Sequence, residues 1–314
     1  MSAESVQARA LRLFRAAWLT TGEPLAAHTS FRIGGPALLF AAPPDAKALR
    51  RLLAFCADER LPWLVLGRGT NLLVSDAGYN GLVIHMGKAW AWLRISGQTA
   101  EVGAGYPLPA LARKTAEAGL AGLEFAAGIP GSTGGAVAMN AGAFGANMAA
   151  VVRDVDCILP SGEACSLANA EMGFAYRHSR ALGEAMIVVG VHLALTPDRP
   201  EDIARRMADF QAQRKERQPL TSWSAGSVFR NPPGDAAGRL IEAAGCKGLR
   251  RGGALVSPKH ANFIVNTGEA TAADVAALMA EVQRRVWETF GVWLEPEIKL
   301  VGEFDAPTPG ARPA

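Results

Sequence analysis

The sequence has few of the residues that mark a disulfide-rich or metal-binding protein. Its 314 residues include only four cysteines, Cys56, Cys157, Cys165 and Cys246, too scattered for a disulfide framework or a zinc knuckle. We therefore expect a reducing compartment, the cytoplasm, and interpret Cys157 and Cys165, which flank a turn, as reduced strand residues. None of the five histidines has metal-ligand spacing with another histidine, a cysteine or a carboxylate, so no metal is predicted.

Charge is missing from one long stretch, between Phe125 and Val152, which exceeds the ~20 residues that a membrane-spanning helix needs. The stretch is rich in glycine and contains Pro130, Asn140 and Asn147, whose backbone and amide groups would stay unsatisfied in lipid. We interpret it as a buried, ligand-facing chain and expect no membrane partner.

The charges nearly balance, with 32 basic against 29 acidic residues and a net charge of +3. This balance argues against a protein whose whole surface binds nucleic acid, although it permits a local basic patch. A chain of this length with 49% hydrophobic residues can bury a sizeable core, which excludes disorder, and roughly two domains are expected.

Local patterns predict a mixture of helices and strands. Leu11, Phe14 and Trp18 fall on one helical stripe, which predicts an amphipathic N-terminal helix that docks on the domain. The other predicted elements are a strand at 38–41, a helix capped by Asp45, strands at 64–66, 82–84 and 187–189, a helix from Pro107 stopped by Gly119, a linker at 196–200, and a helix from Thr271 to Gly291.

Two glycine clusters are candidates for phosphate binding. Gly67–Asn71 directly follows a predicted strand, so its backbone N–H groups can point at an anion, although a plain glycine turn is the alternative. In Gly128–Gly135, glycines permit close backbone approach, and Ser132 and Thr133 can donate to phosphate oxygens. The alternative there is a tight crossing of two buried segments. Together the loops could grip the two ends of a dinucleotide.

Seven motifs occur in a telling order: SFRIGGP from Ser30, GRGTNLLV from Gly67, GIPGSTGG from Gly128, MNAG from Met139, YRHS from Tyr176, GSVF from Gly226 and LEPE from Leu294. This series resembles the UDP-N-acetylenolpyruvoylglucosamine reductase family, flavoproteins that complete UDP-N-acetylmuramate for bacterial peptidoglycan. The resemblance spans about residues 25–302. The short link from Arg177 to Ile187 has no room for a tyrosine-bearing loop, so the resemblance is to the loop-less subtype.

The resemblance implies an α+β fold in which a two-part FAD-binding module of the vanillyl-alcohol-oxidase type precedes a C-terminal α+β substrate-binding domain. We place FAD-binding sub-domain 1 with the N-terminal helix at 1–71, FAD-binding sub-domain 2 at 72–197, the substrate-binding domain at 198–302 and a flexible tail at 303–314.

The resemblance also implies which residues hold FAD. The two glycine loops are expected to hold its diphosphate, and because Arg68 offers no nucleophile for a covalent link, we expect the cofactor to be dissociable. The predicted FAD-binding residues are Arg32, Gly67, Arg68, Gly69, Thr70, Asn71, Gly128, Ile129, Gly131, Ser132 and Gly134.

In the implied reaction, NADPH reduces FAD, and the flavin passes hydride to C3 of the enolpyruvyl ether of UDP-N-acetylglucosamine. By resemblance, Arg177 stabilises the negative charge of the enolate-like intermediate, and Ser227 gives a proton to C2. Glu297 matches the catalytic glutamate, with Glu295 as the rival, because residues 295 and 297 would face the same side of a strand.

Local charge supports an anionic substrate. Residues 205–259 hold eleven basic and four acidic side chains, a net +7 within a chain of +3. The resemblance places Tyr176, Arg217, Asn231 and, less firmly, Arg214 against substrate, whereas Arg205 and Arg206 are interpreted as a solvated helix face. Few aromatic residues lie among these charges as stacking platforms, which disfavours nucleic acid.

The resemblance thus predicts an enzyme of cell-wall synthesis, linked to cell shape, division and the cell cycle, that acts as a monomer on two small molecules in turn. Two alternatives stay open. One is an FAD-dependent oxidase of the same fold, and the other is a nucleotide-sugar binding protein that has lost turnover.

Overall fold

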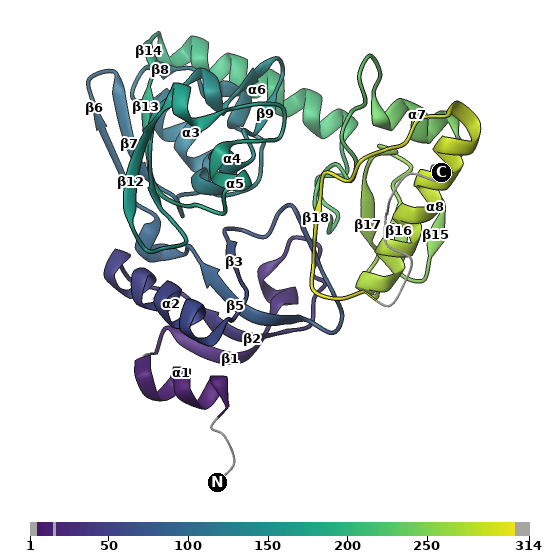
Figure 1. The fold of residues 1–314 in the computed structure, drawn as a ribbon. Helices are drawn as coiled ribbons and strands as arrows, with labels where there is room; N and C mark the ends of the chain where they lie inside the picture. The colour runs from purple at the N-terminus through teal and green to yellow at the C-terminus, as the bar shows by residue number, and fades with distance from the viewer. Residues whose placement is uncertain (1–4, 15–16, 305–314) are drawn as a thin grey trace. The chain divides into compact units, whose positions relative to one another are not determined.

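The computed structural model describes residues 5–14 and 17–304, and it has the α+β fold that the sequence predicts (Figure 1). The chain divides into two compact units that interleave along the sequence. Unit 1 takes the described residues of 1–21, 39–68 and 81–214, and unit 2 takes those of 22–38, 69–80 and 215–314. The predicted domain borders after residues 71, 197 and 302 stay a prediction.

A five-stranded antiparallel sheet in unit 1 has the order β12-β11-β13-β7-β6. Cys157 and Cys165 lie directly opposite each other on two of its strands and are unbridged, as expected, and burial raises the pKa of Cys157 to about 12. The strands are β6 (Leu93–Ser96), β7 (Thr99–Gly103), β11 (Val152–Ile158), β12 (Ala164–Ala168) and β13 (Ile187–Ala194).

The predicted strand–helix–strand segment is confirmed as β2 (Pro36–Ala41), α2 (Ala46–Glu59) and β3 (Trp63–Leu66). The Asp45 carboxylate accepts a hydrogen bond of 2.7 Å from the Ala48 N–H, which satisfies one of the free donors at the start of α2. With β1 (Leu19–Pro24) and β5 (Tyr79–His85) the strands form a sheet in the order β1-β2-β5-β3, where β3 and β5 are parallel.

The predicted N-terminal helix that docks on the domain is confirmed, but its apolar stripe differs from the prediction. Helix α1 (Val6–Phe14) ends before Trp18, and Leu11 is exposed, so the predicted stripe of three apolar residues is wrong. Docking rests on Phe14, which is buried with its ring 5.7 Å from the ring of Phe55 on α2. The helical spacing of Leu11, Phe14 and Trp18 did not reveal that the helix ends before it reaches Trp18.

Unit 2 has an apolar core around its longest helix, α8 (Ala272–Phe290). This helix begins and ends as predicted: the Thr271 hydroxyl accepts from the Asp274 N–H, and Gly291 adopts a left-handed conformation. Other elements of this unit are α7 (Ala237–Ala243), the sheet of β15 (Arg250–Arg251), β16 (Ala254–Val256) and β17 (Ile264–Asn266), and the parallel pair of β4 (Leu72–Val74) and β18 (Lys299–Val301).

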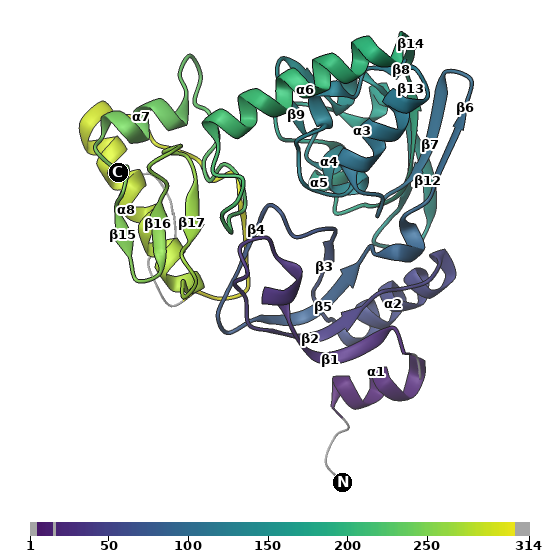
Figure 2. The ribbon, with the colours of Figure 1, turned by 180° about the vertical axis from the view of Figure 1, so that it is seen from behind.

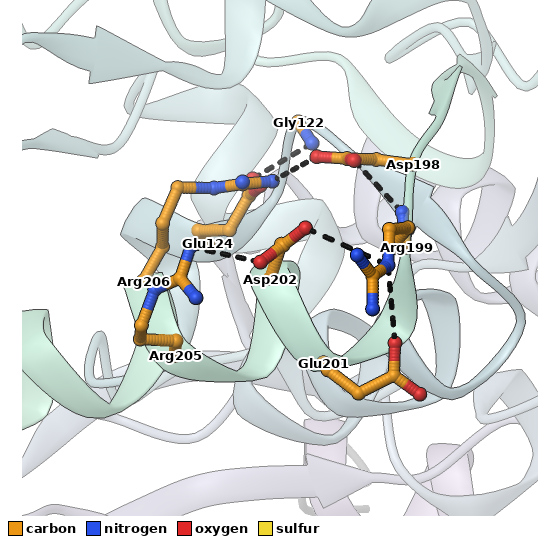
Figure 3. A network of polar contacts seen from close by, with 8 residues as sticks. All are labelled: Gly122, Glu124, Asp198, Arg199, Glu201, Asp202, Arg205 and Arg206. Atoms are coloured by element: carbon orange, nitrogen blue, oxygen red, sulfur yellow. Dashed lines mark hydrogen bonds and ion pairs between the residues drawn. The ribbon is translucent and has the colours of Figure 1, made fainter.

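The predicted linker at 196–200 is instead held at two places. Thr196 and Pro197 form β14, which pairs with β8 (Leu120–Ala121), and Pro200 begins α6 (Pro200–Arg217). Figure 3 shows Arg206 between Glu124 and Asp198, with its Nη2 2.7 Å from an oxygen of each. The view of Arg206 as part of a solvated face is therefore wrong, because its charge ties α6 to the turn after β8.

The uncharged stretch folds into several short elements and is buried only in part: 125–127 and 132–134 are buried as predicted, whereas Phe144 and Gly145 are exposed. They are η3 (Glu124–Ala126), α4 (Thr133–Ala138), β9 (Gly142–Ala143), β10 (Ala146–Asn147) and η4 (Met148–Ala150). Among the described residues, we find no helix with the length and apolar composition to cross a bilayer. Other elements of unit 1 are η2 (Lys88–Trp90), α3 (Leu108–Glu117), η5 (Asn169–Met172) and α5 (Arg180–Gly183), and unit 2 also has η1 (Leu25–His28).

The predicted flexible tail begins with two residues that the structure anchors. The Ser75 hydroxyl donates to the Glu303 carbonyl, and Phe304 packs against the core of unit 2. For residues 303 and 304 the prediction is therefore wrong, and residues 305–314 lie outside the described residues.

Candidate active site

The two glycine loops meet in unit 1 at Gly67 and Ser132. A Cβ on Gly67 would lie 2.2 Å from the Ser132 Oγ, so a side chain at residue 67 would force the Ser132 hydroxyl to move. Gly67 follows β3 directly, and Ser132 precedes α4. Because Gly67 and Ser132 lie far apart in the sequence, the sequence alone does not reveal this contact. The contact brings together two residues that are predicted to bind FAD.

The second glycine loop is tied down by backbone bonds. The Thr133 hydroxyl and N–H both donate to the Tyr106 carbonyl at 2.9 Å, and the Gly134 N–H donates to the Ala104 carbonyl at 2.8 Å. The expectation that Thr133 donates to phosphate is therefore wrong. A Cβ on Gly134 would lie 2.7 Å from the Ala104 Cβ, so this end of the loop is the tight crossing considered as the alternative.

Arg214, predicted as a weak substrate contact, packs on the same loop. A Cβ on Gly128 would lie 2.7 Å from the Arg214 Cδ, and nearby on α6 the Gln211 amide donates to the Ala127 carbonyl. The buried Arg214 Nε has no hydrogen-bond partner among the described residues, and burial lowers the pKa of this guanidinium. An unpaired cation beside a loop of glycines can attract an anion.

Of the other predicted FAD-binding residues, Arg32 and 69–71 lie in unit 2, whereas Arg68, Ile129 and Gly131 lie in unit 1. A Cβ on Gly69 would lie 2.0 Å from the His28 carbonyl oxygen, and the Gly69 carbonyl accepts from the Ser30 N–H at 3.1 Å. The Asn71 amide donates to the Glu297 carbonyl at 3.1 Å. The structure thus joins the first, second and last motifs of the predicted series.

Two of the three predicted catalytic residues, Ser227 and Glu297, lie on neighbouring segments of unit 2. The Glu297 N–H donates to the Val228 carbonyl at 2.8 Å, and Phe229 forms a β-bridge with Pro296. Residues 295–297 belong to no regular strand, but the Arg230 N–H donates to the Glu295 carbonyl at 2.8 Å, so backbone bonds flank the bridge at Pro296 on both sides. That both glutamates face one side stays a prediction. Glu295 is exposed, whereas Glu297 is half-buried.

The third predicted catalytic residue, Arg177, lies in unit 1 on a tight turn. Ala175 and His178 exchange backbone hydrogen bonds of 3.1 and 3.2 Å, which leaves Tyr176 and Arg177 at the tip. The Arg177 guanidinium carbon lies 5.0 Å from the centre of the exposed Tyr176 ring. With φ of 54°, Arg177 has a left-handed backbone that non-glycine residues rarely adopt.

The predicted substrate-binding residues are distributed over both units. Tyr176 and Arg214 belong to unit 1, and Arg217 and Asn231 belong to unit 2. The Asn231 Oδ1 accepts from the Ala237 N–H at 3.0 Å, at the start of α7. Arg217 is exposed at the end of α6.

Ion pairs reduce the charge of the basic segment. Arg206 pairs with Glu124 and Asp198, while Arg205, Arg239 and Lys247 each pair with one acid on their own or an adjacent element. The Arg230 Nη1 lies 3.9 Å from the Glu295 carboxylate. Among the described basic residues of the segment, those for which we find no ion pair are Arg214, Lys215, Arg217, Arg250, Arg251 and Lys259. Several of the net charges counted in the sequence are therefore neutralised within the fold.

One cluster was missed in the sequence. On adjacent strands β11 and β13, the His192 Nε2 lies 2.9 Å from the Asp156 carboxylate and 3.6 Å from that of Asp154. Spacing along the chain gave no signal, because strand pairing joins residues 36 positions apart. The three side chains lie close enough together that they could hold a metal ion, and the absence of a metal stays a prediction.

Comparison with known proteins decides the family. Residues 218–301 match the family model of the UDP-N-acetylenolpyruvoylglucosamine reductase C-terminal domain, and residues 37–168 match that of an FAD binding domain. The reductase of Heliobacterium modesticaldum is 50% identical over 293 residues, which cover 93% of each chain. The chain belongs to the UDP-N-acetylenolpyruvoylglucosamine reductase family.

Other members of the reductase family agree. The reductase of Halalkalibacterium halodurans is 43% identical and aligned over 93% of this chain and 97% of its own. The crystal structure of the Thermus caldophilus reductase superposes with a TM-score of 0.78 at 40% identity, and the match covers 89% of this chain and 98% of that one. The resemblance that the seven motifs indicate is confirmed, and with it the fold.

Proposed function

We propose that the protein is the FAD-containing, NADPH-dependent reductase that converts the enolpyruvyl ether of UDP-N-acetylglucosamine to UDP-N-acetylmuramate, a step of peptidoglycan precursor synthesis. The observation that carries the proposal is the family match over nearly the whole chain. An oxidase or a binding protein without turnover would be a departure from the relatives at this level of identity.

The residues of the glycine loops fit a dinucleotide. Side chains are absent at Gly67 and Gly128, where a Cβ would collide with a neighbour, and the buried Arg214 Nε is left to pair with a ligand. These positions, with Arg68, Ile129, Gly131, Ser132 and Gly134 in unit 1 and Arg32, Gly69, Thr70 and Asn71 in unit 2, would hold FAD without a covalent bond. When bound, FAD supplies the hydride that NADPH provides.

The chain's own residues then manage the charge and the proton. As hydride reaches C3 of the substrate, negative charge grows toward C2 and the adjoining carboxylate. We assign Arg177 to stabilise that charge, because a guanidinium pairs with a carboxylate through two parallel hydrogen bonds. Glu297 would hydrogen-bond near the same carboxylate, and its half-buried position favours it over the exposed Glu295.

Ser227 would give its hydroxyl proton to C2. A serine hydroxyl is a weak acid, so the transfer depends on its placement beside a strongly basic carbon. We propose Tyr176, Arg214, Arg217 and Asn231 as substrate contacts, with NADPH and the substrate using the site in turn. We also propose that the enzyme is monomeric and cytoplasmic, and that it serves cell-wall formation and so cell shape and division.

The proposal is tested by purifying the protein, recording its flavin absorbance, and following NADPH oxidation with and without UDP-N-acetylglucosamine enolpyruvate. We expect a yellow protein whose NADPH oxidation depends on the substrate. A colourless protein, or equal oxidation without the substrate, would overturn the proposal.

The role of Ser227 is tested by Ser227→Ala in stopped-flow experiments. Flavin reduction by NADPH should keep its rate, whereas flavin reoxidation by the enolpyruvyl substrate should fall about 1,000-fold or more, because a proton donor is missing. Ser224→Ala is the matched control, since Ser224 contributes its backbone carbonyl to the Ser30 hydroxyl and the substitution keeps that carbonyl. Normal reoxidation in Ser227→Ala would show that another group supplies the proton.

A further inference from the structure

The turn that carries Arg177 needs support from outside. Arg177 has a φ of 54° in the two-residue tip between Ala175 and His178. A residue with a side chain rarely adopts this conformation, because the conformation costs free energy that other interactions must offset. Tyr176 at the tip is exposed, so apolar packing of the tip supplies little of that support.

A buried amide holds the turn from one side. The Asn140 Nδ2 donates to the Ala175 carbonyl at 3.0 Å, while its Oδ1 accepts from the Ala149 N–H at 3.0 Å. Asn140 is 6% exposed, and the sequence motif that contains it has no other role in the proposed reaction. One side chain therefore connects the first residue of the turn to η4.

A buried hydroxyl holds the turn from the other side. Ser179 directly follows the turn and is fully buried, and its Oγ donates to the Ala138 carbonyl at 2.8 Å. Ala138 is the last residue of α4, whose first residues belong to the second glycine loop. Figures 1 and 2 both show α4 beside α5, the helix that Ser179 precedes, and the two helices are in contact.

We propose that Asn140 and Ser179 are positioning residues for Arg177, and that α4 transmits the position of the glycine loop to the arginine turn. Neither side chain touches substrate. They fix the backbone from which the guanidinium reaches the substrate carboxylate. This inference rests on the proposed function, because it assumes that Arg177 stabilises the enolate-like intermediate.

Asn140→Asp is the sharpest test. The carboxylate keeps an acceptor for the Ala149 N–H and tolerates the left-handed backbone of residue 140, but it faces the Ala175 carbonyl with an oxygen instead of a donor. At pH 8 we expect flavin reoxidation by the enolpyruvyl substrate to slow about 10- to 100-fold, since small displacements of a positioning group have effects of that size. FAD content and flavin reduction by NADPH should stay near normal.

Two readouts separate positioning from a general structural effect. As the pH falls and the introduced carboxyl gains a proton, its O–H can again donate to Ala175, so the reoxidation rate should recover toward the wild-type rate at that pH. In the background of Arg177→Lys, Asn140→Asp should have little further effect on reoxidation, because both changes impair the same interaction.

Asn169→Asp is the matched control. The Asn169 amide donates to the Ala149 and Val152 carbonyls at 2.8 and 2.7 Å, so this change loses two backbone bonds in the same region without touching the turn. We expect normal reoxidation in that variant. Equal slowing in both variants, or effects of Asn140→Asp and Arg177→Lys that multiply, would overturn the proposal.

Ser179→Ala gives an independent second variant if Asn140→Asp fails to fold. It should slow reoxidation several-fold with FAD retained, and unchanged reoxidation would overturn the role of Ser179. The wild-type assay separates the two levels of inference. If wild-type protein does not oxidise NADPH with the enolpyruvyl substrate, the proposed function fails, whereas an active wild type with fully active variants refutes the positioning role alone.

Discussion

Two buried asparagines hold two segments that carry proposed catalytic residues, one in each unit. In unit 1, Asn140 bonds to the Ala175 carbonyl at the base of the Arg177 turn. In unit 2, Asn262 accepts from the Phe229 N–H at 2.9 Å and donates to the Phe229 carbonyl at 2.8 Å, two residues from Ser227. Both asparagines donate an amide hydrogen bond to a backbone carbonyl, but the surroundings of the two segments differ.

The segment in unit 2 lies in an apolar core. Val228 and Phe229 are almost completely buried, as are Leu294 and Ile298 on the two sides of Glu297. The amide of Gln283, a buried residue of α8, also donates to the Leu294 carbonyl at 2.7 Å. Loss of one hydrogen bond should therefore leave this segment in place while lowering the free energy of unfolding.

The turn in unit 1 has a strained backbone at Arg177, and Ala175, Tyr176 and His178 are all exposed, so burial contributes little to holding it. Loss of the Asn140 hydrogen bond should therefore displace Arg177 while lowering the free energy of unfolding only slightly. Equivalent hydrogen bonds are thus expected to support stability where side chains pack densely, and to fix the position of a functional side chain where they do not.

Phe229→Ala should give the largest effect. Removal of this buried ring leaves a cavity beside Ser227 and is expected to lower the free energy of unfolding by about 3–5 kcal/mol. Urea unfolding measures the loss, and Phe290→Ala, at an exposed position of α8, is the control with a small expected effect. Similar losses in both variants would mean that burial of Phe229 does not stabilise unit 2.

Asn262→Asp compares the two asparagines directly. The carboxylate can still accept from the Phe229 N–H, but the Phe229 carbonyl loses its donor in a buried site, which should cost about 1–3 kcal/mol. Measured by urea unfolding, this loss should exceed that of Asn140→Asp, whereas flavin reoxidation should slow more in Asn140→Asp. The reverse ranking in either measurement would refute the comparison.

Glu281→Gln should have the smallest effect, since Glu281 forms ion pairs with Arg284 and Arg285 along one face of α8. Hydrogen bonds from these two arginines lower the pKa of Glu281 from 4.5 to about 2. Because the folded pKa is below the unfolded one, the stabilisation is complete above pH 4.5 and is lost as the pH falls toward 2.

Urea unfolding from pH 7 to pH 2 checks this small effect. The wild type should be slightly more stable than Glu281→Gln at neutral pH, and the difference should vanish at the acid end. A difference that persists at pH 2 would mean that Glu281 stabilises α8 by some means other than its charge.

Much of the local structure was predictable because its causes are close in sequence. Asp45 and Thr271 cap helices through residues three positions away, and Gly291 ends α8 through its own backbone freedom. Family membership was predictable for a related reason. Each motif is a short run of residues, and the seven motifs follow one another along the chain in the order that is typical of the family. The burial of the Leu11 and Trp18 side chains was not predictable, because it depends on which other residues pack around them.

The roles of polar side chains were harder to predict. Thr133 was predicted to donate to phosphate, but in the fold its hydroxyl and its N–H both donate to the Tyr106 carbonyl. Arg206 was predicted to be solvated, but on α6 it donates to the Glu124 carboxylate. A hydroxyl or guanidinium has many possible partners, and the sequence does not say which of them lies within 3 Å.

By itself, the sequence determined the fold class, the family and the helix ends marked by Asp45, Thr271 and Gly291, because these follow from local conformational preferences and from ordered motifs. Only the tertiary structure decided which groups meet. It placed Gly67 against Ser132, distinguished Glu297 from Glu295, and brought Asn140 to the turn of Arg177. The physical reason is that hydrogen bonds and close contacts act over a few ångströms, so their partners are set by the path of the folded chain.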